Sequence, residues 1–244
     1  MITAIIQARM SSTRLPGKIM TVFSGNTLLG HIIERISHSK YISRIIVATT
    51  ENPADDELVK WLEMKAIEYF RGNESDVLNR YFEAAKIAGV SHIARITSDD
   101  PFKDPQVIDE VARLYFDESL DFAYNNKPPT FAEGLDTEIF SFQALSRAES
   151  NARDPFEREH VTQHFYRNAE KFKQKNLKSD LDFSHLRWTI DTEQDLLMTK
   201  LVYENLYKTG QIFLAKDILK LIEKNPQIAA INQHAKRSDM YKKN

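Results

Sequence analysis

The 244-residue sequence contains no cysteine, only seven glycines, and no apolar run long enough to cross a membrane. Without cysteine there is no disulfide framework, no thiolate metal site and no cysteine nucleophile, as is typical of a protein in a reducing cytoplasm. The apolar run at the N-terminus is too short for a secretory signal, and arginine follows it instead of preceding it. We therefore expect a soluble, cytoplasmic protein with no membrane partner.

The charges are nearly balanced, with 33 Lys and Arg against 35 Asp and Glu and a formal net charge of -2. Proteins that bind nucleic acid usually carry a basic excess, so the composition does not support a nucleic-acid partner. The length suits one main hydrophobic core. We expect a single domain over residues 1–224, followed by a polar and basic C-terminal tail at 225–244.

The start of the chain carries a local group of positive charges. Residues 4–18 read AIIQARMSSTRLPGK, a short apolar strand that leads into a hydroxyl-rich loop carrying Arg9, Arg14 and Lys18. Guanidinium groups, an ammonium group and free backbone N–H groups together suit a polyphosphate. The loop is not a Walker A element, because Ile19 stands where that motif requires Ser or Thr. A solvated surface loop is the alternative.

Apolar periodicity predicts alternating strands and helices over the first half of the chain. The predicted strands after the first are residues 44–50, 66–70 and 92–97, and the predicted helices cover 27–39, the stretch with Leu58, Trp61 and Leu62, 75–88 and 106–116. Such alternation is typical of an α/β fold with a mostly parallel sheet covered on both faces. Ligands of open parallel sheets bind beyond the carboxyl ends of the strands. The loops there are residues 7–18, 50–54, 71–76 and 97–105.

The second half is less regular. Residues 121–140 are rich in Asn, Pro and Gly between two strand-like pieces, which predicts an excursion over the active face, acting as a lid, a dimer arm or both. A homodimer is therefore plausible by analogy. The remaining predicted elements are a helix at about 155–168, strand-like segments at 172–177 and 185–190, a helix starting at Thr192 and a last helix at 215–223.

Two aspartates directly follow predicted strands: Asp99 in RITSDDP and Asp191 in RWTIDTEQDL. If the strands are parallel neighbours, both carboxylates lie beside the cationic loop. Mg²⁺ prefers one or two carboxylates together with phosphate oxygens, so the pair predicts a magnesium site. Two structural alternatives stay open. Asp191 could favour the start of a helix with a Thr192–Asp195 capping box, and Asp99 could lie in a simple turn.

The string ARMSSTRLPGK resembles the signature loop of the CMP-sugar synthetases, a CTP-dependent family that includes 3-deoxy-manno-octulosonate cytidylyltransferase and the spore-coat polysaccharide protein SpsF. SDDP and RWTIDTEQDL resemble that family's G-D-x-P and V-D-T-P-E-D-L elements, with Ser98 in place of the common glycine and Gln194 in place of the usual proline. The resemblance implies a Rossmann-like three-layer α/β/α nucleotide-diphospho-sugar transferase fold. It also implies a loop that grips the triphosphate and a metal bound by Asp99 and Asp191.

Three further segments are similar to the SpsF branch: FRGNESDVLNRY, EGLDTEIF and the E-H-V-T element of FEREHVTQHFYR. Together the resemblances imply that catalysis involves Arg9, Arg14, Lys18, Asp99 and Asp191. The implied nucleotide contacts are Ala8, Arg9, Ser12, Arg14, Lys18, Arg71, Gly72, Asp76 and Asp99. The implied sugar contacts are Glu133, Asp136, Glu138 and His160.

Simpler roles exist for some of these residues. Asp76 could cap a helix, and Arg71 could be a surface charge. His160 and His164 have the i, i+4 spacing of a zinc pair, but their order is not H-E-x-x-H and no third ligand is evident, so we expect no zinc.

The resemblance implies an enzyme that transfers CMP from CTP to an acidic 2-keto sugar with release of pyrophosphate, with Mg²⁺ as cofactor, in surface polysaccharide synthesis. Two alternatives stay open. A glycosyltransferase of the related GT-A type would normally carry a D-x-D motif, whereas Asp99 and Asp100 lack the spacer. A nucleotide-binding accessory protein would bind without turnover.

Overall fold

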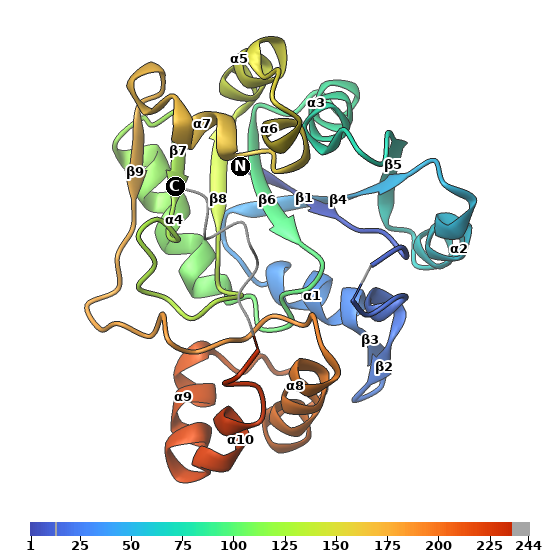
Figure 1. The fold of residues 1–244 in the computed structure, drawn as a ribbon, viewed down its shortest axis with the longest axis vertical. Helices are drawn as coiled ribbons and strands as arrows, with labels where there is room; N and C mark the ends of the chain where they lie inside the picture. The colour runs from blue at the N-terminus through green and yellow to red at the C-terminus, as the bar shows by residue number, and fades with distance from the viewer. Residues whose placement is uncertain (13, 236–244) are drawn as a thin grey trace.

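The computed structural model describes residues 1–12 and 14–235 and is built around a seven-stranded sheet with the order β5-β4-β1-β6-β8-β7-β9 (Figure 1). The strands are β1 Ile2–Gln7, β4 Ile42–Thr50, β5 Glu68–Gly72, β6 His92–Thr97, β7 Phe122–Tyr124, β8 Glu138–Ser141 and β9 Gln174–Asn176. Every pairing in this sheet is parallel except the two that β8 makes. The prediction of a mostly parallel sheet is confirmed.

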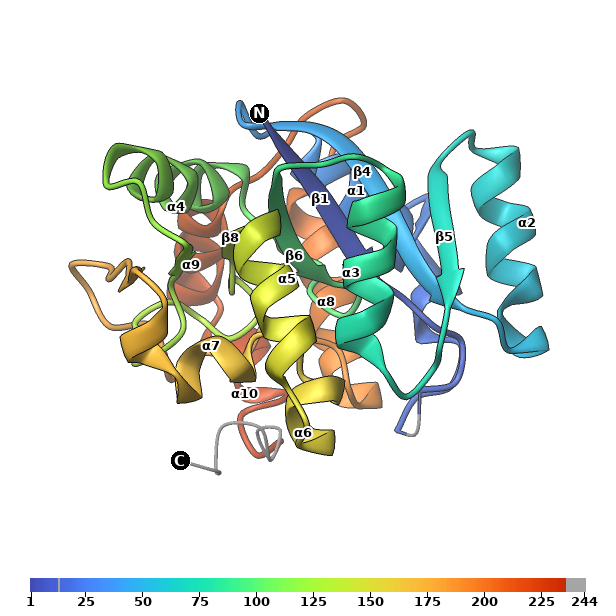
Figure 2. The same ribbon diagram turned by 90° about the horizontal axis from the view of Figure 1, so that it is seen from above.

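Helices cover both faces of the sheet. Figure 2 shows α3 and α5 on one face and α1 and α4 on the other, with α8, α9 and α10 beyond them, which confirms the three-layer arrangement. The helices are α1 Leu28–Ile36, α2 Asp56–Met64, α3 Val77–Ile87, α4 Pro105–Asp117, α5 Phe142–Asn151, α6 Pro155–Glu159, α7 Gln163–Arg167, α8 Glu193–Leu206, α9 Ala215–Lys224 and α10 Pro226–Ala230. A short hairpin, β2 Val22–Phe23 and β3 Asn26–Thr27, lies beside the main sheet.

The central strand β1 is buried on both faces because its isoleucines alternate between two cores. Ile6 belongs to the core that includes Ile32 of α1, and Ile5 to the core that includes Tyr81 of α3. The Tyr81 hydroxyl donates to the backbone carbonyl of Ile5 at 3.0 Å. Burying each large aliphatic side chain contributes about 1.5 to 3 kcal/mol, so β1 is firmly anchored where it ends at the cationic loop.

Two predicted elements differ in the structure. The predicted helix at 155–168 is two short helices, α6 and α7, separated where Thr162 turns inward and donates to Glu138 at 2.8 Å. The predicted strand at 185–190 is extended but belongs to no sheet. Its backbone is instead held through Trp188 N to Glu133 O at 2.7 Å and Ile190 N to Asp99 O at 2.8 Å.

The predicted excursion at 121–140 is anchored at both ends in the main sheet, by β7 and β8, so the irregular part is the segment between them. Gly134 in this segment has φ +105°, and a Cβ there would lie 2.5 Å from the carbonyl oxygen of Trp188. Glycine is therefore needed for the close approach of the two backbones.

We expect Gly134→Ala to lower the free energy of unfolding by about 2 to 3 kcal/mol. The backbones at Gly134 and Trp188 cannot move apart without breaking the hydrogen bond from Trp188 N to Glu133 O. Gly89→Ala is the matched control, since Gly89 has φ +65° with nothing within 4 Å of a built Cβ. It should cost only about 1 kcal/mol of left-handed strain. Urea unfolding measures both values, and equal values would contradict the close-approach argument.

The structure continues the domain past residue 224, where the tail was expected to begin. Helix α10 packs on α8 and α9, and the side chain of Asn232 is buried at 4% exposure. The physical reason is that Ile228 and Ile231 extend the apolar face of α9. The rest of the expected tail, residues 236–244, lies outside the described residues. Within the described part of the chain, no helix is long and apolar enough to cross a membrane.

Candidate functional site

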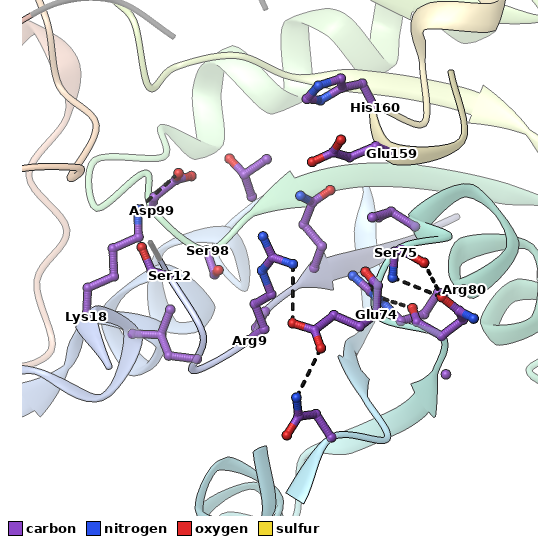
Figure 3. Close-up of a pocket in the computed structure, with 18 of the residues that line it drawn as sticks. Arg9, Ser12, Lys18, Glu74, Ser75, Arg80, Ser98, Asp99, Glu159 and His160 are labelled. Carbon is purple, nitrogen blue, oxygen red and sulfur yellow. Dashed lines mark hydrogen bonds and ion pairs between the residues drawn. The ribbon is translucent and has the colours of Figure 1, made fainter. Parts of the chain in front are cut away.

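A cavity of about 1110 Å³ opens at the carboxyl ends of β1, β4, β5 and β6. All four loops predicted to form the site contribute to its wall. Figure 3 shows Lys18 and Asp99 on one side of the cavity, Glu74 and Arg80 on the other, and His160 with Glu159 across from Arg9. The cavity therefore lies beyond the strand ends, where the sequence analysis predicts the site.

The cationic loop is tied to the sheet by the buried carboxylate of Asp55. One oxygen of this carboxylate accepts the backbone N–H of Met10 at 2.7 Å, and the other accepts the backbone N–H of Thr50 at 3.1 Å. Gly17, at φ +71°, donates its N–H to the Met10 carbonyl at 2.9 Å and closes the loop. The loop after β4 thus fixes the start of the loop after β1, and sequence analysis did not single out Asp55 for this role.

Lys18 lies between the two predicted metal ligands. Its Nζ is 3.3 Å from Oδ2 of Asp99 and 3.0 Å from Oδ1 of Asp191, and it also donates to the carbonyl of Ile190. Burial alone would lower the pKa of Lys18, but the two carboxylates outweigh burial and raise it. Burial would likewise raise the pKa of Asp99, but the Lys18 ammonium lowers it. Both carboxylates therefore converge on one cation.

Asp191 is surrounded by cations. Its Oδ2 lies 2.8 Å from Nη2 of Arg14 and 2.9 Å from Nη2 of Arg187, while Oδ1 faces Lys18. Asp191 is buried, whereas half of the Arg14 side chain is exposed to the cavity. The prediction that Asp99 and Asp191 lie together beside the cationic loop is confirmed. The capping box of Thr192 and Asp195 is also present, so Asp191 precedes a capped helix as well as lining the cavity.

The remaining cations of the cavity are less tightly paired. Arg9 is partly exposed and lies 3.5 Å from Glu74, whose carboxylate also accepts the Ser11 hydroxyl at 2.7 Å. Arg80 is buried, and its guanidinium donates to the backbone carbonyls of Asn73 and Glu74. Burial lowers the pKa of the Arg80 guanidinium. Glu74 and Arg80 both lie within the FRGNESDVLNRY motif but were not predicted as site residues.

The structure brings nine of the predicted site residues to the cavity wall. They are Ala8, Arg9, Ser12, Arg14, Lys18, Gly72, Asp99, His160 and Asp191. Two predicted nucleotide contacts do not line it. Arg71 instead donates to the Thr50 carbonyl at 2.9 Å and pairs with Asp56, so it braces the loop after β4. Asp76 caps α3 and pairs with Arg158.

Three predicted sugar contacts also lie away from the cavity wall. Glu133 is buried against Arg187 at 2.9 Å, and Glu138 is buried against Arg95 at 2.5 Å. For Asp136 the backbone carbonyl accepts the buried ammonium of Lys103. Burial would raise the pKa of Glu138, but Arg95 and three hydrogen bonds hold it below its usual range. These residues connect the excursion to the core, a role that their motif alone does not distinguish from substrate contact.

No group of three or more His, Cys, Asp or Glu side chains that could hold a metal ion occurs among the described residues. His164 pairs with Glu157 at 2.8 Å, while the ring of His160 packs on Phe156. A cation held by two carboxylates and a phosphorylated ligand remains compatible with the site.

Comparison with known proteins agrees with this geometry. The chain matches the family model for cytidylyltransferases over residues 3–236. It is 30% identical to the spore coat polysaccharide biosynthesis protein SpsF of Bacillus subtilis, over 92% of this chain and 95% of that protein. It is 33% identical to an uncharacterized protein of Methanocaldococcus jannaschii, over 97% and 96% of the two chains.

Solved structures of a cytidylyltransferase and of a CMP-sugar synthetase are also similar to this chain. A cytidylyltransferase from Leptospira borgpetersenii superposes with a TM-score of 0.89 at 35% identity, covering 97% of this chain and 98% of that chain. A CMP-2-keto-3-deoxy-manno-octonic acid synthetase in complex with CTP shares the fold, with a TM-score of 0.63 at 15% identity over 84% and 99% of the two chains. The chain described here belongs to the cytidylyltransferase family.

Proposed function

We propose that the protein transfers CMP from CTP to an acidic 2-keto sugar and releases pyrophosphate, using Mg²⁺, in surface polysaccharide synthesis. The observation that carries the proposal is the convergence of Asp99, Asp191 and Lys18 in a cavity that also contains Arg9 and Arg14. The acceptor class is supported by relatives named 3-deoxy-manno-octulosonate cytidylyltransferase, one of which is 31% identical over 45% of this chain. We also propose that the enzyme acts in the cytoplasm and forms a homodimer.

The cations suit the triphosphate. CTP carries about four negative charges, and each opposite charge at 4 Å near a protein surface contributes about 4 kcal/mol before screening. Arg9 and Arg14 are exposed enough to exchange their carboxylate partners for phosphate oxygens. Lys18, on the first turn after the loop, can follow them with its ammonium. These three side chains bind the β- and γ-phosphates and stabilise the pyrophosphate as it leaves.

The residues fit a magnesium ion. Asp99 and Asp191 already share one cation, the Lys18 ammonium, which stands where a bound metal would share them. Two carboxylates and phosphate oxygens are a donor set that Mg²⁺ accepts. When bound, Mg²⁺ supplies neutralisation of the charge that develops on the α-phosphate. The protein contributes the orientation of both carboxylates before the nucleotide arrives.

The acceptor oxygen attacks the α-phosphorus in line with the leaving pyrophosphate, so no covalent enzyme intermediate is required. His160 and Glu159 line the cavity across from the cationic loop and are the side chains placed to contact the sugar. His160 is held at the break between α6 and α7, with its ring 4.5 Å from that of Phe156. Because no covalent enzyme intermediate is required, the absence of cysteine does not weaken the proposal.

Pyrophosphate release tests the function. The purified protein is incubated with CTP, Mg²⁺ and a panel of sugars in which 2-keto acids are paired with neutral sugars of the same size. Acid-dependent release with formation of a CMP-sugar is the expected result. Pyrophosphate release with neutral sugars alone would show that the acceptor is a neutral sugar and not a 2-keto acid. Release with none of the sugars would contradict the proposal.

Arg14→Ala should weaken CTP binding by about tenfold, because one charge-assisted contact to phosphate contributes about 1.5 to 3 kcal/mol and Arg14 is half exposed. Arg147→Ala is the control, since Arg147 is equally exposed at 50% and pairs with Asp121 away from the cavity. Calorimetric titration with CTP compares the two variants. Equal affinities would remove Arg14 from the phosphate site.

A further inference from the structure

A cluster of buried charged side chains lies outside the cavity wall and contacts Asp191 from the interior of the protein. Its centre is the Arg187 guanidinium, which lies 2.9 Å from Glu133, 2.9 Å from Asp191 and 3.0 Å from Asp195. All four side chains are less than 10% exposed. Burial would lower the pKa of Arg187, but these carboxylates raise it, so it stays charged. A guanidinium shared by three carboxylates holds each of them in a defined orientation.

The cluster determines which oxygen of Asp191 faces the cavity cation. Oδ2 accepts Arg187 Nη2 and also pairs with Arg14 at 2.8 Å, while Oδ1 faces the Lys18 ammonium that Asp99 also contacts. Because Arg14 is proposed to turn to the phosphates when CTP binds, Arg187 is then the partner that keeps Oδ2 in place. If the Arg187 contact were lost, the carboxylate could rotate, and Oδ1 would no longer be directed to the shared position. The position at which Asp99 and Asp191 share a cation therefore depends on Arg187, which does not contact that cation.

The C-terminal segment completes this cluster. The Asn232 amide, which follows α10, donates to Asp195 Oδ1 at 2.8 Å and to the Arg187 carbonyl at 3.0 Å. The other oxygen of Asp195 accepts the backbone N–H groups of Asp191 and Thr192 at 3.0 and 2.9 Å. Asn232 thus contacts the Arg187 backbone directly and the Asp191 backbone through Asp195. In Figure 1 this segment lies between α8 and α9.

We propose that Arg187 is a positioning residue for Asp191 and that the C-terminal segment, through Asn232, is a structural part of the cation site. The proposal rests on the proposed function, since it takes Asp191 to bind the metal of the nucleotide complex. Residues that orient a metal ligand typically change metal affinity by 10- to 100-fold when they are replaced. Neither Arg187 nor Asn232 lines the cavity, so both act through Asp191.

Asn232→Ala is compared with Asn225→Ala. Asn225 is the matched control because its amide donates to the Leu221 carbonyl at 3.1 Å at the junction of α9 and α10 but does not reach the cluster. Mn²⁺ is used as the probe, and its affinity for the CTP complex is measured by electron paramagnetic resonance. We expect about a tenfold weaker Mn²⁺ affinity in Asn232→Ala and less than a twofold change in Asn225→Ala. CTP affinity without metal should be unchanged in both.

A second variant, Arg187→Lys, keeps the charge but cannot hold three carboxylates with one ammonium. We expect a larger loss of Mn²⁺ affinity than in Asn232→Ala, with the melting temperature recorded to show that the domain is folded. Raised KM for Mg²⁺ with a smaller change in kcat at saturating Mg²⁺ would support positioning. Unchanged Mn²⁺ affinity in both Arg187→Lys and Asn232→Ala would overturn the proposal.

Hydrogen exchange gives a readout that needs no ligand. The N–H groups of Asp191 and Thr192 should exchange at least tenfold faster in Asn232→Ala than in Asn225→Ala, because Asp195 loses one of its restraints. Equal exchange rates would overturn the proposal even if the wild-type protein binds CTP. If the wild-type protein binds no CTP, the proposed function fails, and the exchange rates alone decide whether Asn232 restrains Asp191.

Discussion

Asp191→Asn should reduce turnover by about 1000-fold, the largest loss we expect from any single substitution. Asp191 is the carboxylate on which Arg14, Lys18 and Arg187 converge, and it shares its cation with Asp99. A metal at a phosphoryl centre stabilises the transition state by several kcal/mol, and about 4 kcal/mol corresponds to a factor of 1000. The kcat for pyrophosphate release measures the loss.

Asparagine is chosen because it keeps the volume of the side chain and leaves Arg187 with two carboxylates. Asp109→Asn is the control, since Asp109 is also buried and accepts the Lys40 N–H at 3.0 Å, away from the cavity. Both variants should lower the melting temperature by similar amounts, and only Asp191→Asn should lose turnover. Turnover within tenfold of the wild-type value would contradict a metal role for Asp191.

Lys18→Met should produce two effects of opposite sign. Loss of the ammonium should weaken CTP binding and turnover by about 100-fold, because a charge that contacts the phosphates is removed. In the nucleotide-free protein, however, Asp99 and Asp191 would share no cation, so binding of Mg²⁺ should become tighter. In the proposed site, the buried ammonium at 3.3 and 3.0 Å from the two carboxylates would compete with the metal in the wild-type chain.

Calorimetric titration of the variant with CTP and, separately, with Mg²⁺ alone measures both effects. Tighter Mg²⁺ binding together with weaker CTP binding would match the account. Weaker binding of both would show that Lys18 holds the carboxylates in place instead of occupying the cation position, and that result would contradict the competition.

Much of the fold follows from the periodicity of the sequence. The strand predicted at 92–97 has the observed bounds of β6, and the helix predicted at 27–39 is observed as α1, with Thr27 as its N-cap accepting the Gly30 N–H. These elements alternate regularly, and their apolar faces are unambiguous. Because the carboxyl ends of parallel strands meet at one edge, the position of the site followed without knowledge of any side-chain contact.

The predictions that failed depend on contacts between distant residues. RWTI at 187–190 has the composition of a strand, but its backbone bonds pair it with residues 99 and 133 outside the sheet. Glu133 and Glu138 lie in a motif that suggests substrate contact, yet each faces a buried arginine. Asn232 contacts Asp195 across 37 positions, and no local pattern indicates such a pairing. Motifs identify residue types, whereas burial decides which of them reach the cavity.

In the proposed function, the cavity binds CTP through the cationic loop and a metal held by Asp99 and Asp191. Calorimetric titration of the wild-type protein with CTP, UTP, ATP and a UDP-sugar, with and without Mg²⁺, tests it most directly because no acceptor is needed. The account predicts selective CTP binding that strengthens when Mg²⁺ is present. A preference for the UDP-sugar, or no nucleotide binding at all, would contradict it.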